Sequence, residues 1–176
     1  MPMFDLLRQR RSVRSYSDQA LENDKIKLLC EALLRAPSSR NLQPCQFVLV
    51  DEADTLTRLA TAKPHGTSFF QTAPLAVVIA ADPAVSDVWI EDCSVAAFTL
   101  QLAAEELDLK SCWGQLRLRP HDDERSASEF VRDLVGLPEQ MEVPIVIAVG
   151  YPDQELEGHP RSSLKNGKIH WNKFSS

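Results

Sequence analysis

Three arginines and a serine lie within five residues near the start of the sequence, at Arg10, Arg11, Ser12 and Arg14. A guanidinium group binds phosphate well because its planar fork donates two parallel hydrogen bonds. A serine hydroxyl adds a short donor for another phosphate oxygen. The pattern therefore predicts a phosphate-binding site. The alternative is a solvent-exposed basic turn without a ligand, since small charge clusters are common on protein surfaces.

A second polar segment follows, bounded by two prolines. Its sequence is Pro37-Ser38-Ser39-Arg40-Asn41-Leu42-Gln43-Pro44. Prolines and hydrogen-bonding side chains in this density predict a loop. The loop offers donors and acceptors for a ligand. The alternative is a simple helix stop, in which Ser38 and Asn41 satisfy nearby backbone groups.

The charge distribution indicates that the two ends of the chain hold any anionic ligand. The net charge is −6 over 176 residues, but residues 1–40 carry +3, residues 151–176 carry +1 and residues 41–150 carry −10. The acidic body argues against a general nucleic-acid-binding protein. With 44% hydrophobic residues and no repeat or linker, residues 1–176 are expected to form a single domain.

The cysteines and histidines point to no metal or disulfide site. Cys30, Cys45, Cys93 and Cys112 are far apart and form no C-x-x-C pair, so each is expected to be reduced and packed as a small apolar residue. The four histidines show no ligand spacing. Without an apolar run of signal-peptide or membrane-spanning length, a cytoplasmic protein with no membrane partner is expected.

The elements that must position these side chains follow from apolar spacing. Helices are predicted from about Phe4 to near Arg10, from an Asn23 or Asp24 cap to Ala36, over 52–62, from a Ser86 or Asp87 cap to about Leu107, and over 120–134. Strands are predicted over 46–50, 75–80, 110–116 and 143–149, with a loop over 63–73. This order favours an α+β fold, with a mixed sheet between helices.

Residues 151–176 differ from the rest. Prolines, glycines and polar residues break regular structure there, yet Leu164, Ile169, Trp171 and Phe174 are apolar. A segment with apolar side chains and no core of its own is expected to lie over another surface. Trp171 and Phe174 are more simply read as interface residues than as residues stacking on a ligand.

Five segments, taken in this order, resemble the nitroreductase family of FMN-dependent oxidoreductases. They are Arg10–Arg14, Ala36–Pro44, Leu107–Gly114, Val149–Pro152 and Ile169–Asn172. The family has R-R-S-x-R, A-P-S-x-x-N-x-Q-P-W, L-G-L-G-[ST]-x-W, G-Y-P and V-H-W at these places. Each motif alone is weak, but together they span nearly the whole chain.

The resemblance implies a mainly antiparallel sheet sandwiched between helices in an intertwined homodimer. FMN would lie at the subunit interface, and residues 151–176 would wrap over the partner subunit. The implied activity is hydride transfer from NADH or NADPH to a small oxidised acceptor (a nitroaromatic, a quinone or a flavin) by a ping-pong mechanism, with the chemistry at flavin N5 rather than at a catalytic side chain.

The resemblance also implies which residues contact FMN: Arg10, Arg11, Ser12, Arg14, Pro37, Ser38, Ser39, Asn41, Gln43, Gly114, Gln115 and Arg161. The arginine segment and Arg161 would hold the phosphate and the ribityl and pyrimidine edge, with Arg14 near N1 and O2. The 37–43 segment would come from the partner subunit, with Asn41 near N5 or O4. The Gly114 and Gln115 backbone would face the ring, because the missing Cβ of Gly114 allows close approach.

The sequence departs from the family at several of these places. Cys45 replaces the loop tryptophan, Asp108 and Lys110 replace two glycines, and His159 replaces a lysine two residues before Arg161. Little chain is available to cover the flavin, so an open substrate pocket is expected.

Two other functions remain open from the residues alone. One is a flavin-binding protein without turnover, acting as an FMN store or redox sensor. The other is an anionic-ligand or nucleic-acid module built on the basic N-terminus, which the acidic body disfavours.

Overall fold

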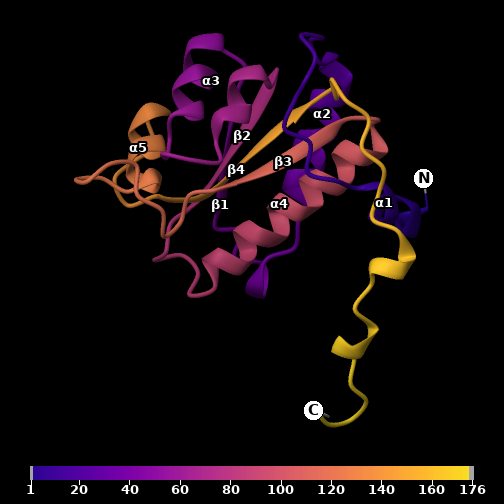
Figure 1. Ribbon diagram of the computed structural model, residues 1–176. Coiled ribbons are helices and arrows are strands. Elements are labelled where there is room, and N and C mark those ends of the chain that lie inside the picture. The colour runs from indigo at the N-terminus through magenta and orange to yellow at the C-terminus, as the bar shows by residue number, and fades with distance from the viewer. Residues whose placement is uncertain (1, 175–176) are drawn as a thin grey trace.

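A computed structural model gives the structure of the chain and describes residues 2–174. Helices and strands alternate irregularly along these residues (Figure 1). The helices are α1 (Met3–Gln9), α2 (Asn23–Arg35), α3 (Ala53–Ala60), α4 (Trp89–Glu106) and α5 (Ala127–Leu134). The strands are β1 (Cys45–Val50), β2 (Leu75–Ala81), β3 (Lys110–Gln115) and β4 (Glu142–Gly150).

The four strands form one sheet in the order β1-β2-β4-β3, and each neighbouring pair is antiparallel. The predicted mixed character is limited to an isolated parallel bridge between Ser12 and Ser111. Pro144 lies near the start of β4, where the register with β2 shifts between Ile79 and Ala81. A proline has no N–H to donate, so it is accommodated at such an irregularity.

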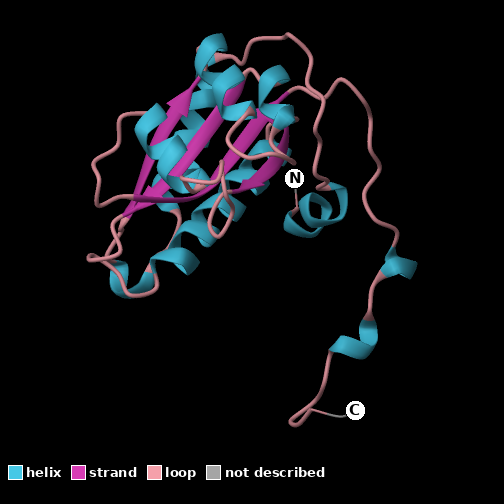
Figure 2. Ribbon diagram, turned by 60° about the vertical axis from the view of Figure 1, so that its left-hand side comes forward, coloured by secondary structure: helices cyan, strands magenta, loops and turns pink. Residues whose placement is uncertain are grey.

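Two helical layers cover the sheet, which confirms the predicted α+β sandwich. Helices α2 and α4 cover one face, and α3 and α5 cover the other (Figures 1 and 2). Successive residues of β2 alternate between these layers: Val77 packs on the α4 side and Val78 on the α3 side. Strand β2 is buried along its whole length, as its continuous apolar run predicts.

The predicted starts of α2 and α4 are wrong. Glu22, rather than Asn23 or Asp24, caps α2, and it makes no side-chain cap bond. Helix α4 begins at Trp89, because Ser86 bonds to Asp92 inside the helix instead of capping it. The side chains of Asp24 and Ser86 form hydrogen bonds with other side chains instead of with the free N–H groups at the helix ends.

The helix predicted over 120–134 is reduced to α5. Pro120 and the turns after it replace the first part, and the helix starts after Ser126. The Ser126 hydroxyl accepts from the Glu129 N–H, and the Glu129 carboxylate accepts from the Ser126 N–H. This capping box fixes the start, and the S-x-x-E spacing in the sequence is its signal.

The tail beyond β4 extends away from the body (Figure 2). It contains only short 3-10 turns, at Arg161–Ser163 and Asn166–Lys168, within the residues described. Trp171 is 87% exposed and Phe174 is 81% exposed. Within one chain these apolar side chains therefore have no surface that buries them.

Candidate active site

The arginine segment is extended and is fixed to the edge of the sheet. Val13 is buried, and its N–H donates to Ser111 O at the start of β3 (3.1 Å). The buried Tyr16 hydroxyl donates to Val13 O (2.7 Å). Because neighbouring side chains of an extended segment point to opposite sides, Ser12 and Arg14 point away from the core that holds Val13. The backbone therefore presents these two side chains together.

Basic side chains surround the start of β3. Burial raises the pKa of the Cys112 thiol, and three nearby positive charges act in the opposite direction. These charges belong to Arg14, Arg10 and Lys63. Ser12 and Val13, which lie between Arg10 and Arg14 in the sequence, pair with Ser111 through an isolated bridge and a backbone hydrogen bond. This pairing holds the backbone of the arginine segment beside the start of β3.

Lys63 was missed from the sequence, where it lies in a loop with no recognisable motif. Its pKa is lowered by burial and by the charge of Arg119. A partly buried ammonium beside other cations is destabilised without an anion. The donors of the arginine segment itself, which are Arg10, Ser12 and Arg14, are of the kind that binds a phosphate or an anionic flavin ring.

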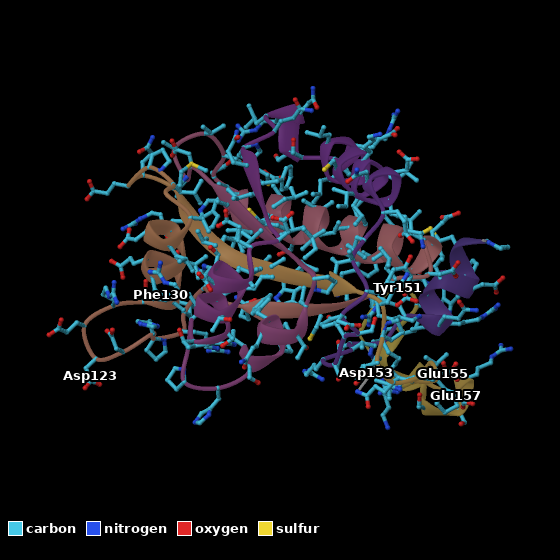
Figure 3. All side chains as sticks on the ribbon, turned by 90° about the horizontal axis from the view of Figure 1, so that it is seen from above. Asp123, Phe130, Tyr151, Asp153, Glu155 and Glu157 are labelled. Atoms are coloured by element: carbon cyan, nitrogen blue, oxygen red, sulfur yellow. The ribbon has the colours of Figure 1, made fainter. Side chains whose placement is uncertain are left out.

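Arg11 has a different contact from its neighbours. Its Nη1 donates to Glu157 O at the start of the tail (2.6 Å). One residue later, a Cβ on Gly158 would lie 1.7 Å from Arg8 O, so only glycine fits against this turn of backbone. Figure 3 shows Glu155 and Glu157 along this part of the tail, beyond Tyr151. Arg11 therefore fixes the path of the tail across the end of α1.

Arg161 lies a few residues further along the tail, in the first 3-10 turn, and is exposed. Its contact with the FMN phosphate stays a prediction, as do the FMN contacts predicted for Arg11 and the other site residues.

The loop between α2 and β1 is held by a buried carboxylate. Asp92, in the first turn of α4, accepts from the Ser39 N–H (2.8 Å) and from the Ser86 hydroxyl (2.8 Å). The Ser38 hydroxyl accepts from the Gln43 N–H (2.9 Å). Part of the helix-stop reading is thus correct for Ser38, because its side chain satisfies the backbone. Asn41 is exposed and its side chain faces away from the core.

The same loop has an unusual backbone. Arg40, Asn41 and Gln43 have φ values of 51°, 54° and 48°. The left-handed region costs a residue with a Cβ about 1–2 kcal/mol. Conformations of this kind persist where surrounding contacts fix them, and they cluster at ligand sites. The hydrogen bonds of Ser38 and Ser39 therefore hold the loop in one defined, strained conformation.

Replacing Asp92 with alanine is expected to lower the free energy of unfolding by about 1–3 kcal/mol, because buried donors on Ser39 and Ser86 lose their acceptor. Urea denaturation measures this change. The matched control is Asp87→Ala, which removes an exposed ion pair with Arg40 and is expected to change stability by less than about 1 kcal/mol. Equal effects of the two substitutions would contradict the role given to Asp92.

The two polar segments lie toward opposite ends of α4. The 37–44 loop contacts Asp92 in the first turn, whereas Ser111, beside the arginine segment, accepts from Gln101 Nε2 (3.2 Å). Asp92 and Gln101 are about 14 Å apart along the helix axis at 1.5 Å per residue. The loop and the arginine segment therefore lie apart from each other on one chain.

Gly114 packs closely against the core. A Cβ at this position would lie 2.8 Å from the Phe70 ring and 3.1 Å from Val146 O, so the missing side chain makes room for the core. The predicted contact of its backbone with the flavin ring stays a prediction. The neighbouring Gln115 side chain accepts from Trp113 Nε1 (3.0 Å) and donates to Arg117 O (3.3 Å). Any ligand contact of this pair would thus come from the backbone.

Gly114→Ala is expected to destabilise the protein by about 1–3 kcal/mol, since the added methyl group overpacks the core against Phe70. Thermal or urea unfolding measures the loss. Gly167→Ala is the control, because nothing lies within 4 Å of its added Cβ. An unchanged midpoint for Gly114→Ala would show that Phe70 moves aside freely.

Residues 2–174 contain neither a metal site nor a membrane-spanning helix. No group of three or more His, Cys, Asp or Glu side chains is arranged to hold a metal ion. No helix among these residues has the length and apolar character needed to cross a lipid bilayer.

The profile of the nitroreductase family matches residues 7–151. The chain belongs to the nitroreductase family. The family resemblance of the five sequence motifs is thereby confirmed, and the arrangement of helices around the antiparallel sheet agrees with it.

Individual nitroreductases are similar over nearly the full length. The solved structure of an FMN-dependent nitroreductase from Clostridium difficile R20291 is similar to this chain with 40% sequence identity and a TM-score of 0.95, covering 97% of this chain and 99% of that one. A relative from Archaeoglobus fulgidus is 34% identical over 170 residues, covering 94% of both chains. Its name gives NADH dehydrogenase and NAD(P)H nitroreductase as suggested activities.

Proposed function

We propose that this nitroreductase is an FMN-dependent oxidoreductase that takes hydride from NADH or NADPH and passes it to a small oxidised acceptor by a ping-pong mechanism. Nitroaromatics, quinones and flavins are the proposed acceptors. The observation that carries the proposal is the extended Arg10–Arg14 segment, which Ser12 and Val13 fix to Ser111 at the edge of the sheet. The FMN dependence named for the C. difficile relative supports it.

Bound FMN supplies the hydride chemistry at ring atom N5. The chain would bind and orient it: Arg10 and Ser12 would hold the phosphate, and Arg161 would add a third contact from the tail. Arg14 would supply positive charge to the electron-rich ring. The exposed and half-buried positions of these side chains allow such charge-assisted and hydroxyl hydrogen bonds.

The complete site is proposed to form in a homodimer. Because the 37–44 loop and the arginine segment lie toward opposite ends of α4, a partner subunit supplies the loop that faces the arginine segment. Exposed apolar side chains offer the interface: Phe4 on α1 (69%), Leu34 on α2 (71%) and Phe98 on α4 (41%). Burial of these side chains against a partner subunit would stabilise the dimer.

The tail is proposed to wrap over the partner subunit. Its exposed residues Leu164, Ile169, Trp171 and Phe174 would be buried there. The single-domain assignment of 1–176 and the cytoplasmic location remain predictions.

An anaerobic reduction experiment tests the activity. The protein is loaded with FMN, freed of excess cofactor and mixed with NADH or NADPH while the flavin absorption is followed. Loss of the oxidised-flavin band, and its return when a quinone or nitroaromatic is added, is the expected result. If the oxidised-flavin band persists with both nicotinamides, the oxidoreductase proposal is wrong and the protein binds flavin without turnover.

A further inference from the structure

Two cysteines that are far apart in the sequence meet between β1 and α4. Cys45 Sγ and Cys93 Sγ are 3.6 Å apart, against about 2.0 Å in a disulfide. Cys93 is fully buried, whereas Cys45 is only half-buried. Strand β1 and helix α4 already pack against each other at this point, since both residues belong to the same side of the core.

The two thiols are chemically unequal. The hydrogen bond with Cys93 lowers the pKa of Cys45, although burial acts in the opposite direction. That same bond and burial raise the pKa of Cys93. The negative charge of Asp92 raises both pKa values to a smaller extent. A thiolate is the reactive form of cysteine, and the lowered pKa and partial exposure of Cys45 favour it as the nucleophile of the pair.

Of the two sulfurs in contact, Cys45 is the one that small molecules can reach. It lines a cavity of about 440 Å³ between α2, β1 and α4, together with Ser38, Pro44 and Asp92. Cys93 does not line this cavity, whereas Cys30 does. An oxidant that enters the cavity therefore reaches Cys45 before its partner Cys93, and Cys30 is the thiol that competes with Cys45 for it.

We propose that Cys45 and Cys93 form a dithiol redox pair that is oxidised by a peroxide. The Cys45 thiolate attacks one oxygen of hydrogen peroxide, the O–O bond breaks, and Cys45 sulfenic acid and hydroxide form. The Cys93 sulfur then attacks the Cys45 sulfur, the S–O bond breaks, and a disulfide and water form. In total, two thiols and one peroxide give one disulfide and two waters, and the two electrons pass from sulfur to oxygen.

The disulfide would connect the end of the 37–44 loop covalently to α4. Cys45 directly follows Pro44 at the end of this loop, and Cys93 directly follows Asp92, which already holds Ser39 through a hydrogen bond. Oxidation therefore adds a covalent bond beside an existing polar contact. The inference goes beyond the proposed function, because it holds whether or not the protein turns over a nicotinamide.

Mass spectrometry of the full-length protein tests the pair. The reduced protein is treated with a small excess of hydrogen peroxide without FMN, alkylated under denaturing conditions and digested. The expected product is one peptide pair joined through Cys45 and Cys93, with Cys30 and Cys112 alkylated and full reversal by dithiothreitol. A folded wild-type protein that keeps all four thiols, or that joins Cys30 or Cys112 instead, would overturn the proposal.

Three variants separate the roles of the two sulfurs. Cys93→Ser is expected to accumulate Cys45 sulfenic acid, trapped by dimedone, and to form no intramolecular disulfide. Cys45→Ser is expected to give neither product, and Cys30→Ser is the matched control that behaves as wild type. Dimedone labelling of Cys93 in Cys45→Ser at the rate seen for Cys45 in Cys93→Ser would contradict the assignment of Cys45 as nucleophile. Circular dichroism establishes that each variant is folded before it is treated.

Discussion

Replacing both Arg10 and Arg14 with alanine is expected to weaken FMN binding by about 3–6 kcal/mol, since a hydrogen bond to a charged group contributes about 1.5–3 kcal/mol. That loss corresponds to a dissociation constant raised at least about a hundredfold. Both residues are held by a backbone that is fixed through Val13 to Ser111, so the substitutions leave that backbone in place. Quenching of flavin fluorescence on titration measures the affinity.

The matched control is Arg58→Ala, which removes an exposed arginine from α3, outside the arginine segment. It is expected to leave the dissociation constant for FMN unchanged. Wild-type affinity in the double variant would show that the arginine segment is a solvent-exposed basic turn, and the phosphate site would have to be sought elsewhere.

Ending the chain after Gly158 is expected to convert the protein to a monomer without bound FMN. The truncation removes Leu164, Ile169, Trp171 and Phe174, which are exposed in one chain. Burial of each such side chain contributes about 1.5–3 kcal/mol, so their loss weakens the dimer by several orders of magnitude. FMN is lost with the dimer because the 37–44 loop of one chain separates from the arginine segment of the other. Sedimentation equilibrium and the flavin content of the purified protein measure the two effects.

A polar change in the same segment provides the control. Lys168→Ala removes an exposed charge from the second 3-10 turn and is expected to preserve both dimer and cofactor. A truncated protein that stays dimeric and binds FMN at wild-type strength would show that the tail does not cover the partner subunit.

The fold could be predicted because its main elements have strong local patterns. The continuous apolar run of β2 and the nearly all-apolar centre of α4 are long, and both are buried as expected. Helix starts were less predictable, since Ser86 and Asp24 are good caps by type but bond elsewhere. The start of α5 had a readable signal in the Ser126–Glu129 capping box.

The candidate site could be predicted only in part, because most of its supporting contacts join distant segments. Arg10 and Arg14 are recognisable as a local cluster, but Lys63 joins them only through the fold. The bond from Ser39 to Asp92 spans 53 residues, and the contact of Cys45 with Cys93 spans 48. Gly114 was recognised as special, yet the group that requires it is Phe70.

The central claim is that each site combines the arginine segment of one chain with the 37–44 loop of another. The most direct test pairs two defective chains, one carrying Arg10→Ala and Arg14→Ala, the other carrying Ser38→Ala and Asn41→Ala. Each variant carries its own affinity tag, so that the mixed dimer can be purified after co-expression. In that dimer one site combines both intact segments, and the other site combines both altered ones.

Neither variant homodimer is expected to retain FMN through gel filtration, whereas the mixed dimer is expected to retain one FMN per dimer. A mixed dimer as empty of FMN as the two homodimers would place both segments of each site on the same chain and contradict the composite site.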